Sequence, residues 1–281
     1  MRNAGKRAMP RRERVRLLVF AALALAVLLV AVFAPCLAPY DPYAQDMGHA
    51  LEAPSARHLL GTDTYGRDLL SRVILGARAS VFSTLVLVLL ISVVGSLLGV
   101  LCGWFGGWLD MVLMRVSDVF LAFPGLVLAI AVAGVFGGGM PGAVLALAAV
   151  SWPKYTRLAR SQTLAVKLAP YMSAAAMANN TPLQMIFRHV LPNIAGPLLI
   201  TAALDIGTLM MELAGLSFLN LGAQAPAAEW GAMMSRGRSM LQSSPWVILG
   251  PGVAIFLTVM IFNLLGDAVR DWLDPRGEQR G

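Results

Sequence analysis

Two acidic side chains stand inside one strongly apolar stretch of the sequence, residues 194–217. Asp205 lies near the middle of this stretch, and Glu212 follows it at a distance of seven residues. In a helix that spacing is about two turns, so both carboxylates share a face. A charge at the centre of a membrane costs at least about 2.5 kcal/mol, and such residues usually face a bundle interior or a cavity. We therefore expect Asp205 and Glu212 to hold a gate or to line a pathway.

The two methionines that precede Glu212, Met210 and Met211, add soft ligand groups to this stretch. Carboxylate and thioether groups are compatible with a metal ion or its chelate, but ligand type alone does not select a metal. Methionine also packs in helices as an ordinary apolar side chain. Two interpretations stay open: Asp205 bonds to a neighbouring helix as a structural gate, or it contacts a cationic cargo directly. Whether a metal binds here stays unknown.

The sequence lacks the motifs that would make it an enzyme of a familiar kind. It contains no G-x-x-x-x-G-K-[ST] phosphate loop, no G-x-S-x-G elbow and no H-E-x-x-H pair. We therefore predict a non-catalytic protein without a cofactor of its own. If its work needs ATP and Mg²⁺, other chains must bind them.

A polar-flanked segment, residues 171–193, predicts two short helices joined by a tight turn. The first helix should end at Asn179, because asparagine tolerates the left-handed cap conformation. Thr181 is a typical N-cap and Pro182 a typical first helical residue. The second helix should run to about Leu191, and Pro192 should open the next apolar run.

This segment is also unusually apolar for a connection between helices, and exposed apolar surface marks a partner site. It therefore predicts a knob that docks on a cytoplasmic protein. The apolar residues are Met172, Met177, Leu183, Met185, Ile186, Phe187 and Val190.

A second segment combines two glycines with charged side chains. Gly61 and Gly66 allow tight turns around Asp63, and Arg67 can pair with Asp63 or with Asp68. The pattern predicts an ordered loop. It is either a rigid connection or a binding surface for another protein, since ordered loops often carry binding residues.

Long apolar runs must position all of these side chains. Of 281 residues, 58% are hydrophobic and 13% charged, which is too little charge to cover a soluble domain. The stretch 119–151 has no charged residue at all. We predict an all-α integral membrane bundle of six transmembrane helices. The expected spans are 17–34, 81–102, 119–136, 142–158, 194–217 and 247–266.

Basic residues predict the orientation of this bundle. The segment 154–192 has no acidic residue, and the positive-inside rule places it in the cytoplasm together with the basic N-terminus. An even number of spans, four, separates the two, as this placement requires. The basic residues concerned are Lys154, Arg157, Arg160, Lys167 and Arg188. The net charge of +7 belongs to such flanking residues, so no nucleic-acid partner is expected.

These assignments divide the chain into one membrane domain with two tails. Loops 35–80 and 218–246 are expected to face outward. The expected parts are a cytoplasmic basic tail at 1–16, a six-helix transmembrane domain at 17–266 with a cytoplasmic loop at about 160–192, and a cytoplasmic tail at 267–281.

The docking segment resembles the coupling loop of ABC importer permeases, in which Glu-Ala-Ala and a later Gly precede an aliphatic-x-Leu-Pro ending. The matching positions are Ala174, Ala175, Val190, Leu191 and Pro192. Two positions depart from the pattern: Ser173 replaces the usual Glu and Asn179 the usual Gly. The Glu normally makes a charge-assisted contact at the ATPase interface, so this contact is in doubt.

Longer motifs narrow the resemblance. The sequences HLLGTDTYGRD (58–68), ELAGLSFLNLG (212–222), EWG (229–231) and NLLGDAVRD (263–271) are similar to those of the dipeptide/oligopeptide/nickel permease family, second subunit. The resemblance implies a type I importer permease in the bacterial inner membrane. Its expected partners are a homologous second permease, two cytoplasmic ATPase subunits that bind ATP and Mg²⁺, and an extracytoplasmic substrate-binding protein.

The motif LDIG at 204–207, followed by the methionine pair, looks most like the nickel branch of that family. Nickel or a metal chelate is therefore the expected cargo, with di- or oligopeptides as the alternative. A stand-alone secondary transporter or channel is the alternative of another class. The docking segment and the lack of an evident internal repeat argue against it.

Overall fold

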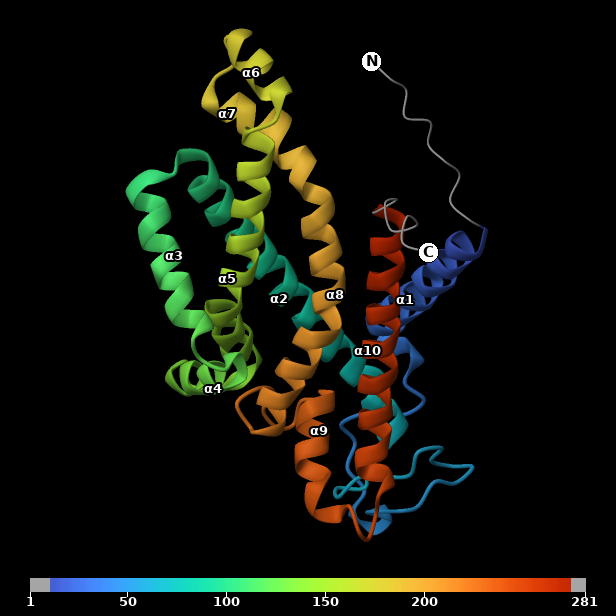
Figure 1. The fold of residues 1–281 in the computed structure, drawn as a ribbon. Coiled ribbons are helices and arrows are strands. Elements are labelled where there is room, and N and C mark those ends of the chain that lie inside the picture. Colours follow the sequence, from blue (N-terminus) through green and yellow to red (C-terminus); the bar gives the residue numbers. More distant parts are fainter. Residues whose placement is uncertain (1–10, 274–281) are drawn as a thin grey trace.

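The computed structural model describes residues 11–273, which form a bundle of long helices (Figure 1). Within this range the only β-pairing is one isolated bridge between Thr62 and Asp68. The all-α prediction is therefore confirmed. Residues 1–10 and 274–281, which belong to the two predicted tails, lie outside the described residues.

The described residues form α-helices that are joined mostly by short connections. The α-helices are α1 (Arg11–Leu37), α2 (Leu69–Phe105), α3 (Gly107–Leu121), α4 (Gly125–Val135), α5 (Gly139–Lys167), α6 (Pro170–Met177), α7 (Pro182–Met185), α8 (Leu191–Phe218), α9 (Trp230–Gly237) and α10 (Trp246–Leu273). Two 3₁₀ turns, η1 (Met47–His49) and η3 (Arg238–Met240), and a π-helical turn, η2 (Ile186–Val190), complete the set.

Four of these helices are long and apolar enough to cross a membrane, and the bent pair α3–α4 makes a fifth if it counts as one span. The four are α1, α2, α10 and the continuous run from α7 to the end of α8. The predicted number of six is therefore not reached by this measure. The remaining expected span corresponds to α5, which is long enough but more polar than the others.

Helix α5 corrects the predicted boundary between the fourth span and the cytoplasmic loop. The expected span ended at residue 158, whereas the helix continues to Lys167, so four of the five basic residues assigned to the loop lie on α5. Acidic partners on neighbouring helices explain how the helix can carry three of these four charges, because pairing lowers the free-energy cost of a charge in the bundle. The pairs are Lys154 with Asp205, Arg157 with Asp118, and Arg160 with Asp110.

The predicted third span, 119–136, is two helices. α3 and α4 meet at an angle of 98°, and Pro124 is the residue directly before α4. Proline lacks the N–H that a helix interior requires, and it also disfavours helical backbone at the residue before it. The helical segment therefore bends at Pro124. It also begins at Gly107, well before the expected start at residue 119.

Helix α2 begins at Leu69, so the last part of the predicted loop 35–80 is helical. Asp68 is the N-cap of this helix and accepts a hydrogen bond from the amide of Ser71 at 2.8 Å. The helix has 37 residues, which is about 55 Å of length. Because the hydrocarbon core of a bilayer is about 30 Å thick, α2 extends beyond it.

Glycines bring α2 directly against α5. Gly95, Gly99 and Gly103 follow one another at four-residue spacing, and a Cβ atom at Gly95 would lie 2.7 Å from the carbonyl oxygen of Trp152. The hydroxyl of Thr156 donates a hydrogen bond to the Gly95 carbonyl across this contact, at 3.0 Å. Small residues at such spacing are the usual device for close helix packing in membranes. The four-residue spacing of these glycines is visible in the sequence and is a signal from which this contact could have been predicted.

Two buried apolar clusters join the long helices. One lies between α2, α4, α5 and α8, and the other joins α1, α2, α8, α9 and α10. The larger side chains of the first cluster are Leu87, Ile91, Leu147, Tyr155, Leu213 and Leu216.

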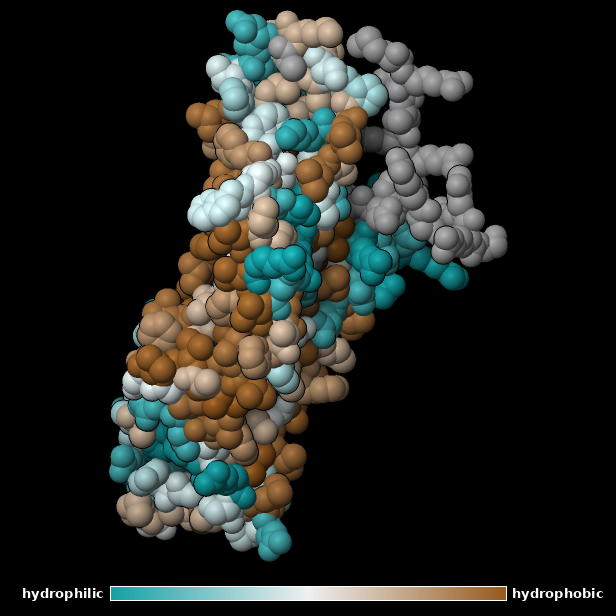
Figure 2. Space-filling model, turned by 60° about the vertical axis from the view of Figure 1, so that its left-hand side comes forward, coloured by the Kyte–Doolittle hydropathy of each residue, from teal (hydrophilic) through white to brown (hydrophobic). Residues whose placement is uncertain are grey.

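The bundle has two distinct ends. Helices α6 and α7 lie at one end, whereas α9 and the loop between α1 and α2 lie at the other (Figure 1). The start of α1 and the end of α10 point toward the α6–α7 side. Figure 2 shows hydrophobic residues across the middle of one face and hydrophilic residues gathered toward both ends. This distribution is typical of a bundle that crosses a membrane.

Candidate functional site

The segment at the α6–α7 end has the helix-turn-helix geometry expected from the sequence. Asn179, just after α6, has a φ of 61°, the left-handed conformation. Thr181 caps α7: its hydroxyl accepts a hydrogen bond from the Gln184 amide at 3.3 Å, and the Gln184 side chain accepts one from the Thr181 amide at 2.8 Å. Pro182 is the first residue of α7. This reciprocal capping fixes the entry into the second helix.

The end of this second helix differs from the prediction. Pro192 was expected to start a separate span, but the chain stays helical from α7 through the π-helical turn η2 into α8. A π-helical turn is wider than an α-helical one. The backbone just before Pro192 therefore has room for a residue that lacks an N–H and would clash in a regular helix.

The apolar residues of the segment divide into two sets. Four are buried against Val100 of α2 and Ala159 of α5: Met172, Met185, Ile186 and Val190. These anchor the segment to its own bundle and cannot meet a partner, which corrects the prediction that all seven are available. The others are exposed, together with Leu168 and Tyr171. We call this exposed set the docking patch: Leu168 (85% exposed), Tyr171 (45%), Met177 (88%), Leu183 (64%) and Phe187 (65%).

The positions that resemble the family pattern lie in the same segment as the docking patch, partly on its surface and partly buried. Ser173 and Ala174 are exposed on α6, and Ala175 is half-buried against the anchoring cluster. At the other end of the pattern, Val190 is fully buried and Leu191 packs beside it. The pattern thus contains both surface positions and the residues that support them.

Near the middle of the bundle, Asp205 of α8 forms an ion pair with Lys154 of α5. The Nζ and Oδ1 atoms are 2.6 Å apart. Asp205 is buried, and Glu212 lies two turns further along α8 and is half-buried. Lys154 was missed because the sequence analysis treated it as part of a basic loop. An isolated Asp inside an apolar helix implies a partner, but the sequence does not say which residue it is.

The predicted methionine pair does not form a common site with these acids. Met210 is buried in the cluster that joins α1, α2, α9 and α10, whereas Met211 is 55% exposed on another side of α8. Neighbouring residues of a helix point about 100° apart, so only one of them can face a given cavity. Within residues 11–273 no group of three or more His, Cys, Asp or Glu side chains is placed to hold a metal ion.

At the opposite end, the loop between α1 and α2 is built around Asp63. Gly61 and Gly66 have φ values of 76° and 70°, as the turns on either side require. One carboxylate oxygen of Asp63 accepts hydrogen bonds from the amides of Tyr65 and Arg67, at 2.8 and 3.1 Å. The other pairs with the Arg67 guanidinium at 2.7 Å. Of the two partners open to Arg67, the structure therefore selects Asp63.

Asp68, the other possible partner of Arg67, is engaged elsewhere. It caps α2, and one of its oxygens lies 2.9 Å from Nδ1 of His58, a buried side chain. His58 and Asp68 thereby close the loop at the start of α2.

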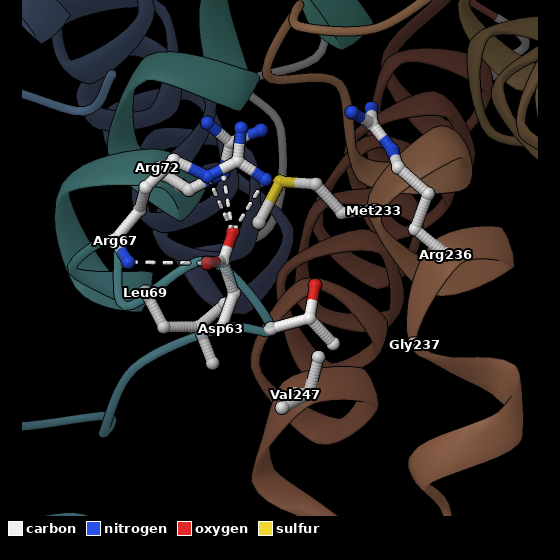
Figure 3. Close-up of a pocket in the computed structure, with 9 residues that line it drawn as sticks. Asp63, Arg67, Leu69, Arg72, Met233, Arg236, Gly237 and Val247 are labelled. Carbon is white, nitrogen blue, oxygen red and sulfur yellow. Dashed lines mark hydrogen bonds and ion pairs between the residues drawn. The ribbon is translucent and has the colours of Figure 1, made fainter. Parts of the chain in front are cut away.

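A buried arginine that the sequence analysis did not single out completes this end. Arg72, 1% exposed, lies 3.4 Å from Asp63 through its Nε atom. Its other two nitrogens donate to the carbonyl oxygens of Pro42 and Pro226, at 2.8 and 3.3 Å. Figure 3 shows Arg67 and Arg72 converging on Asp63. Arg72 therefore connects the loop between α1 and α2, helix α2 and the segment before α9.

The EWG motif fastens α9 to α2. Glu229 is 1% exposed, and its carboxylate accepts hydrogen bonds from the Ser80 hydroxyl at 3.0 Å and from the Ala232 amide at 2.8 Å. The indole N–H of Trp230 donates to the Val73 carbonyl at 2.8 Å. A carboxylate at a helix N-terminus satisfies free amides there, so Glu229 both starts α9 and docks it on α2.

Comparison with known proteins identifies this arrangement of helices. The family described as "Binding-protein-dependent transport system inner membrane component" matches residues 95–279, and "N-terminal TM domain of oligopeptide transport permease C" matches residues 16–54. The chain belongs to the dipeptide/oligopeptide family of ABC importer permeases. It is thus a non-catalytic, multi-pass subunit of the inner membrane, and a stand-alone transporter or channel is no longer an alternative.

Several similar proteins are named for the transport of peptides. The chain is 45% identical to the probable D,D-dipeptide transport system permease protein DdpC of Escherichia coli (strain K12), over 89% of this chain and 84% of that protein. It is 42% identical to the glutathione transport system permease protein GsiD of Pectobacterium atrosepticum, over 90% and 84%. It is 40% identical to the dipeptide transport system permease protein DppC of Alkalihalophilus pseudofirmus, over 89% and 82%. These names favour the peptide alternative over the predicted nickel cargo.

A solved structure supports the permease fold. The MetNI methionine ABC transporter, in an inward-facing conformation, matches with a TM-score of 0.58 at 18% identity, over 72% of this permease and 96% of that chain. At this identity the likeness concerns the fold alone, which is that of a type I importer permease.

Proposed function

We propose that this permease forms half of the translocation path of an importer for dipeptides or similarly short peptides. The observation that supports a peptide cargo is that relatives at 40–45% identity are named for D,D-dipeptide, dipeptide and glutathione transport. The other half of the path comes from a homologous second permease. A substrate-binding protein delivers cargo on the outer side, and two cytoplasmic ATPase subunits bind ATP and Mg²⁺.

The docking patch is the surface that the ATPase subunit contacts. Five exposed apolar side chains, on the two short helices α6 and α7 and in the turns directly before and after them, form an apolar surface at one end of the bundle that a partner protein can cover. The anchored residues beneath them connect the patch to α2, α5 and α8, so movement of the ATPase is transmitted to the spans. The residues assigned to coupling are Ser173, Ala174, Ala175, Asn179, Val190, Leu191 and Pro192.

The translocation path runs beside α5 and α8. Lys154 is 56% exposed although it lies midway along a helix of the bundle. A charged group at that depth has to face water or a protein partner rather than lipid. We assign α5 as the sixth span, and the Lys154–Asp205 pair together with Glu212 as the polar lining or gate. Met210 packs behind this lining, and Met211 lies on another side of α8.

The α6–α7 end is cytoplasmic in this proposal. The tails 1–16 and 267–281 lie on the same side, and the membrane domain occupies 17–266. The outward loop, with Gly61, Asp63, Gly66, Arg67 and Asp68, then faces the binding protein.

Uptake by the reconstituted importer tests the cargo. The complete complex, with both permeases, both ATPases and its binding protein, is assayed in proteoliposomes with labelled dipeptide, D,D-dipeptide, glutathione and ⁶³Ni²⁺. ATP-dependent uptake of at least one peptide, unaffected by excess Ni²⁺, is expected. ATP-dependent uptake of nickel without peptide uptake would reinstate the metal assignment.

A further inference from the structure

Three guanidinium groups gather around one carboxylate at the outward end of the bundle. Asp63 pairs with Arg67 at 2.7 Å and with Arg72 at 3.4 Å. Arg236, on α9, approaches the same region (Figure 3). It donates only to two backbone carbonyl groups, at 3.0 and 2.8 Å. Within residues 11–273 the structure contains no carboxylate paired with Arg236.

The neighbouring acids are already occupied. Glu229 accepts hydrogen bonds from the Ser80 hydroxyl and from amides at the start of α9. Asp68 is held by His58 and by the cap of α2. Burial, and next the positive charge of Arg67, lower the pKa of Arg236 from its usual value. Asp63 and Glu229 oppose this effect with their negative charges, so three guanidinium groups face two carboxylates and one positive charge remains in excess among the described residues.

A pocket opens beside this excess charge. It has a volume of about 280 Å³ and is lined by Gln45, Tyr65, Arg67, Ala225, Pro226 and Arg236. The guanidinium of Arg67 lies over the ring of Tyr65, 4.7 Å from its centre, which holds it at the pocket wall. A smaller inner hollow, shown in Figure 3, is lined by the same two arginines together with Asp63 and Arg72.

We propose that this pocket is a carboxylate site and that it receives an acidic side chain of the substrate-binding protein. The guanidinium fork matches the geometry of a carboxylate, and an incoming Asp or Glu supplies the missing negative charge. The inference rests on the proposed function in one respect, namely that a binding protein docks at the outward end.

The position of the pocket favours a protein side chain over the cargo itself. Its walls come from the loop between α1 and α2 and from the segments around α9, at the end opposite the docking patch (Figure 1). The proposed path, in contrast, runs beside α5 and α8. A carboxylate bound here would therefore hold the delivering protein in place while the cargo enters elsewhere.

Affinity measurements on the complete importer test the site. The importer is placed in lipid nanodiscs, and the dissociation constant of its binding protein is measured for wild type, Arg236→Gln and Arg236→Lys. Arg238→Gln is the matched control, because Arg238 is exposed two residues away and does not line the pocket. Removing the charge is expected to weaken docking about tenfold and to flatten its dependence on salt. The affinity of Arg236→Lys should lie between those of wild type and Arg236→Gln, and the affinity of the Arg238→Gln control should equal that of wild type.

A double-mutant cycle identifies the partner group. Asp and Glu residues on the docking face of the binding protein are changed to Asn or Gln one at a time. For the residue that enters the pocket, the double variant with Arg236→Gln should lose no more binding affinity than either single variant. Thermal unfolding of each variant importer verifies that it is folded, and Arg236→Lys provides a variant that keeps the buried charge.

Three results would overturn the proposal. Unchanged affinity in folded Arg236→Gln removes the site. Loss of the second permease from the purified complex shows that the carboxylate comes from that subunit. Unchanged docking with selective loss of uptake for peptides with a free carboxylate, but not for their amides, assigns the pocket to cargo. Docking is measured without uptake, so failure of the peptide assignment would leave an Arg236-dependent affinity intact.

Discussion

Lys154 and Asp205, 51 residues apart in the sequence, form an ion pair of 2.6 Å that connects α5 to α8. The Asp205 side chain is 10% exposed and that of Lys154 is 56% exposed. One charge is thus enclosed while the other reaches the surface of the isolated subunit. A pair of this kind can hold two helices together and present a charge to whatever lies alongside them.

Removing one partner of this pair should impair both stability and transport. Asp205→Leu leaves the ammonium unpaired and is expected to lower the free energy of unfolding by roughly 1 to 3 kcal/mol, between the values for surface and buried pairs. Asp205→Asn keeps a hydrogen-bond acceptor and should lower the free energy of unfolding by a smaller amount. Thermal unfolding and peptide uptake of the purified importer measure the two effects.

The exchanged pair Lys154→Asp with Asp205→Lys separates pairing from charge position. If the contact matters only as a link between α5 and α8, the double variant should regain stability and uptake. Regained stability without uptake would show that the sign of the charge in the path matters. Wild-type stability and uptake in Asp205→Leu would mean that the pair contributes to neither.

The docking patch should be sensitive to charge. Leu183→Glu places a carboxylate in an apolar interface, and its desolvation is expected to reduce co-purification of the ATPase at least about tenfold. Leu59→Glu is the control, since Leu59 is 65% exposed and Leu183 is 64% exposed, but Leu59 lies in the loop between α1 and α2, at the opposite end of the bundle. The amount of ATPase retained on the tagged permease is the measurement. Equal retention in both variants would remove the patch from the interface.

The proposed orientation predicts opposite labelling of two exposed methionines. Met47 in the outward loop is 66% exposed, and Met177 in the docking patch is 88% exposed. In a background without Cys36 and Cys102, Met47→Cys should react with a membrane-impermeant maleimide in intact spheroplasts, whereas Met177→Cys should react only after lysis. The reverse pattern would invert the bundle and refute ATPase docking at the α6–α7 end.

Close packing of α2 on α5 predicts a strong effect of one added methyl group. A Cβ at Gly99 would lie 2.7 Å from that of Ala159 and close to the backbone of α5. Gly99→Ala is therefore expected to destabilise the permease by about 1 to 3 kcal/mol. Gly134→Ala has open space around it and should gain up to about 1 kcal/mol from helix propensity. The midpoints of thermal unfolding of the two variants are compared. Equal midpoints would contradict the close packing of α2 on α5.

Much of the fold was predictable because the signals for it are local. Apolar runs identify helices, since each residue contributes to the pattern independently of the rest of the chain. The turn after α6 follows from Asn179, Thr181 and Pro182, whose preferences act within a few residues. The bend at Pro124 could also have been predicted by applying the same proline rule to the third run.

The sequence by itself determined that this protein is a bundle of membrane helices and where the turn between α6 and α7 lies, because hydrophobic length and capping preferences need no distant partner. Only the tertiary structure decided which charges meet. In the sequence Lys154 looks like any lysine of a basic loop, and only the packing of α8 shows that Asp205 lies beside it. Arg236 likewise has no distinguishing sequence pattern, and only the fold shows that Arg67 and Arg72 lie near it. Such contacts join residues far apart along the chain, so their energies depend on the folded arrangement of helices and leave no local pattern to detect.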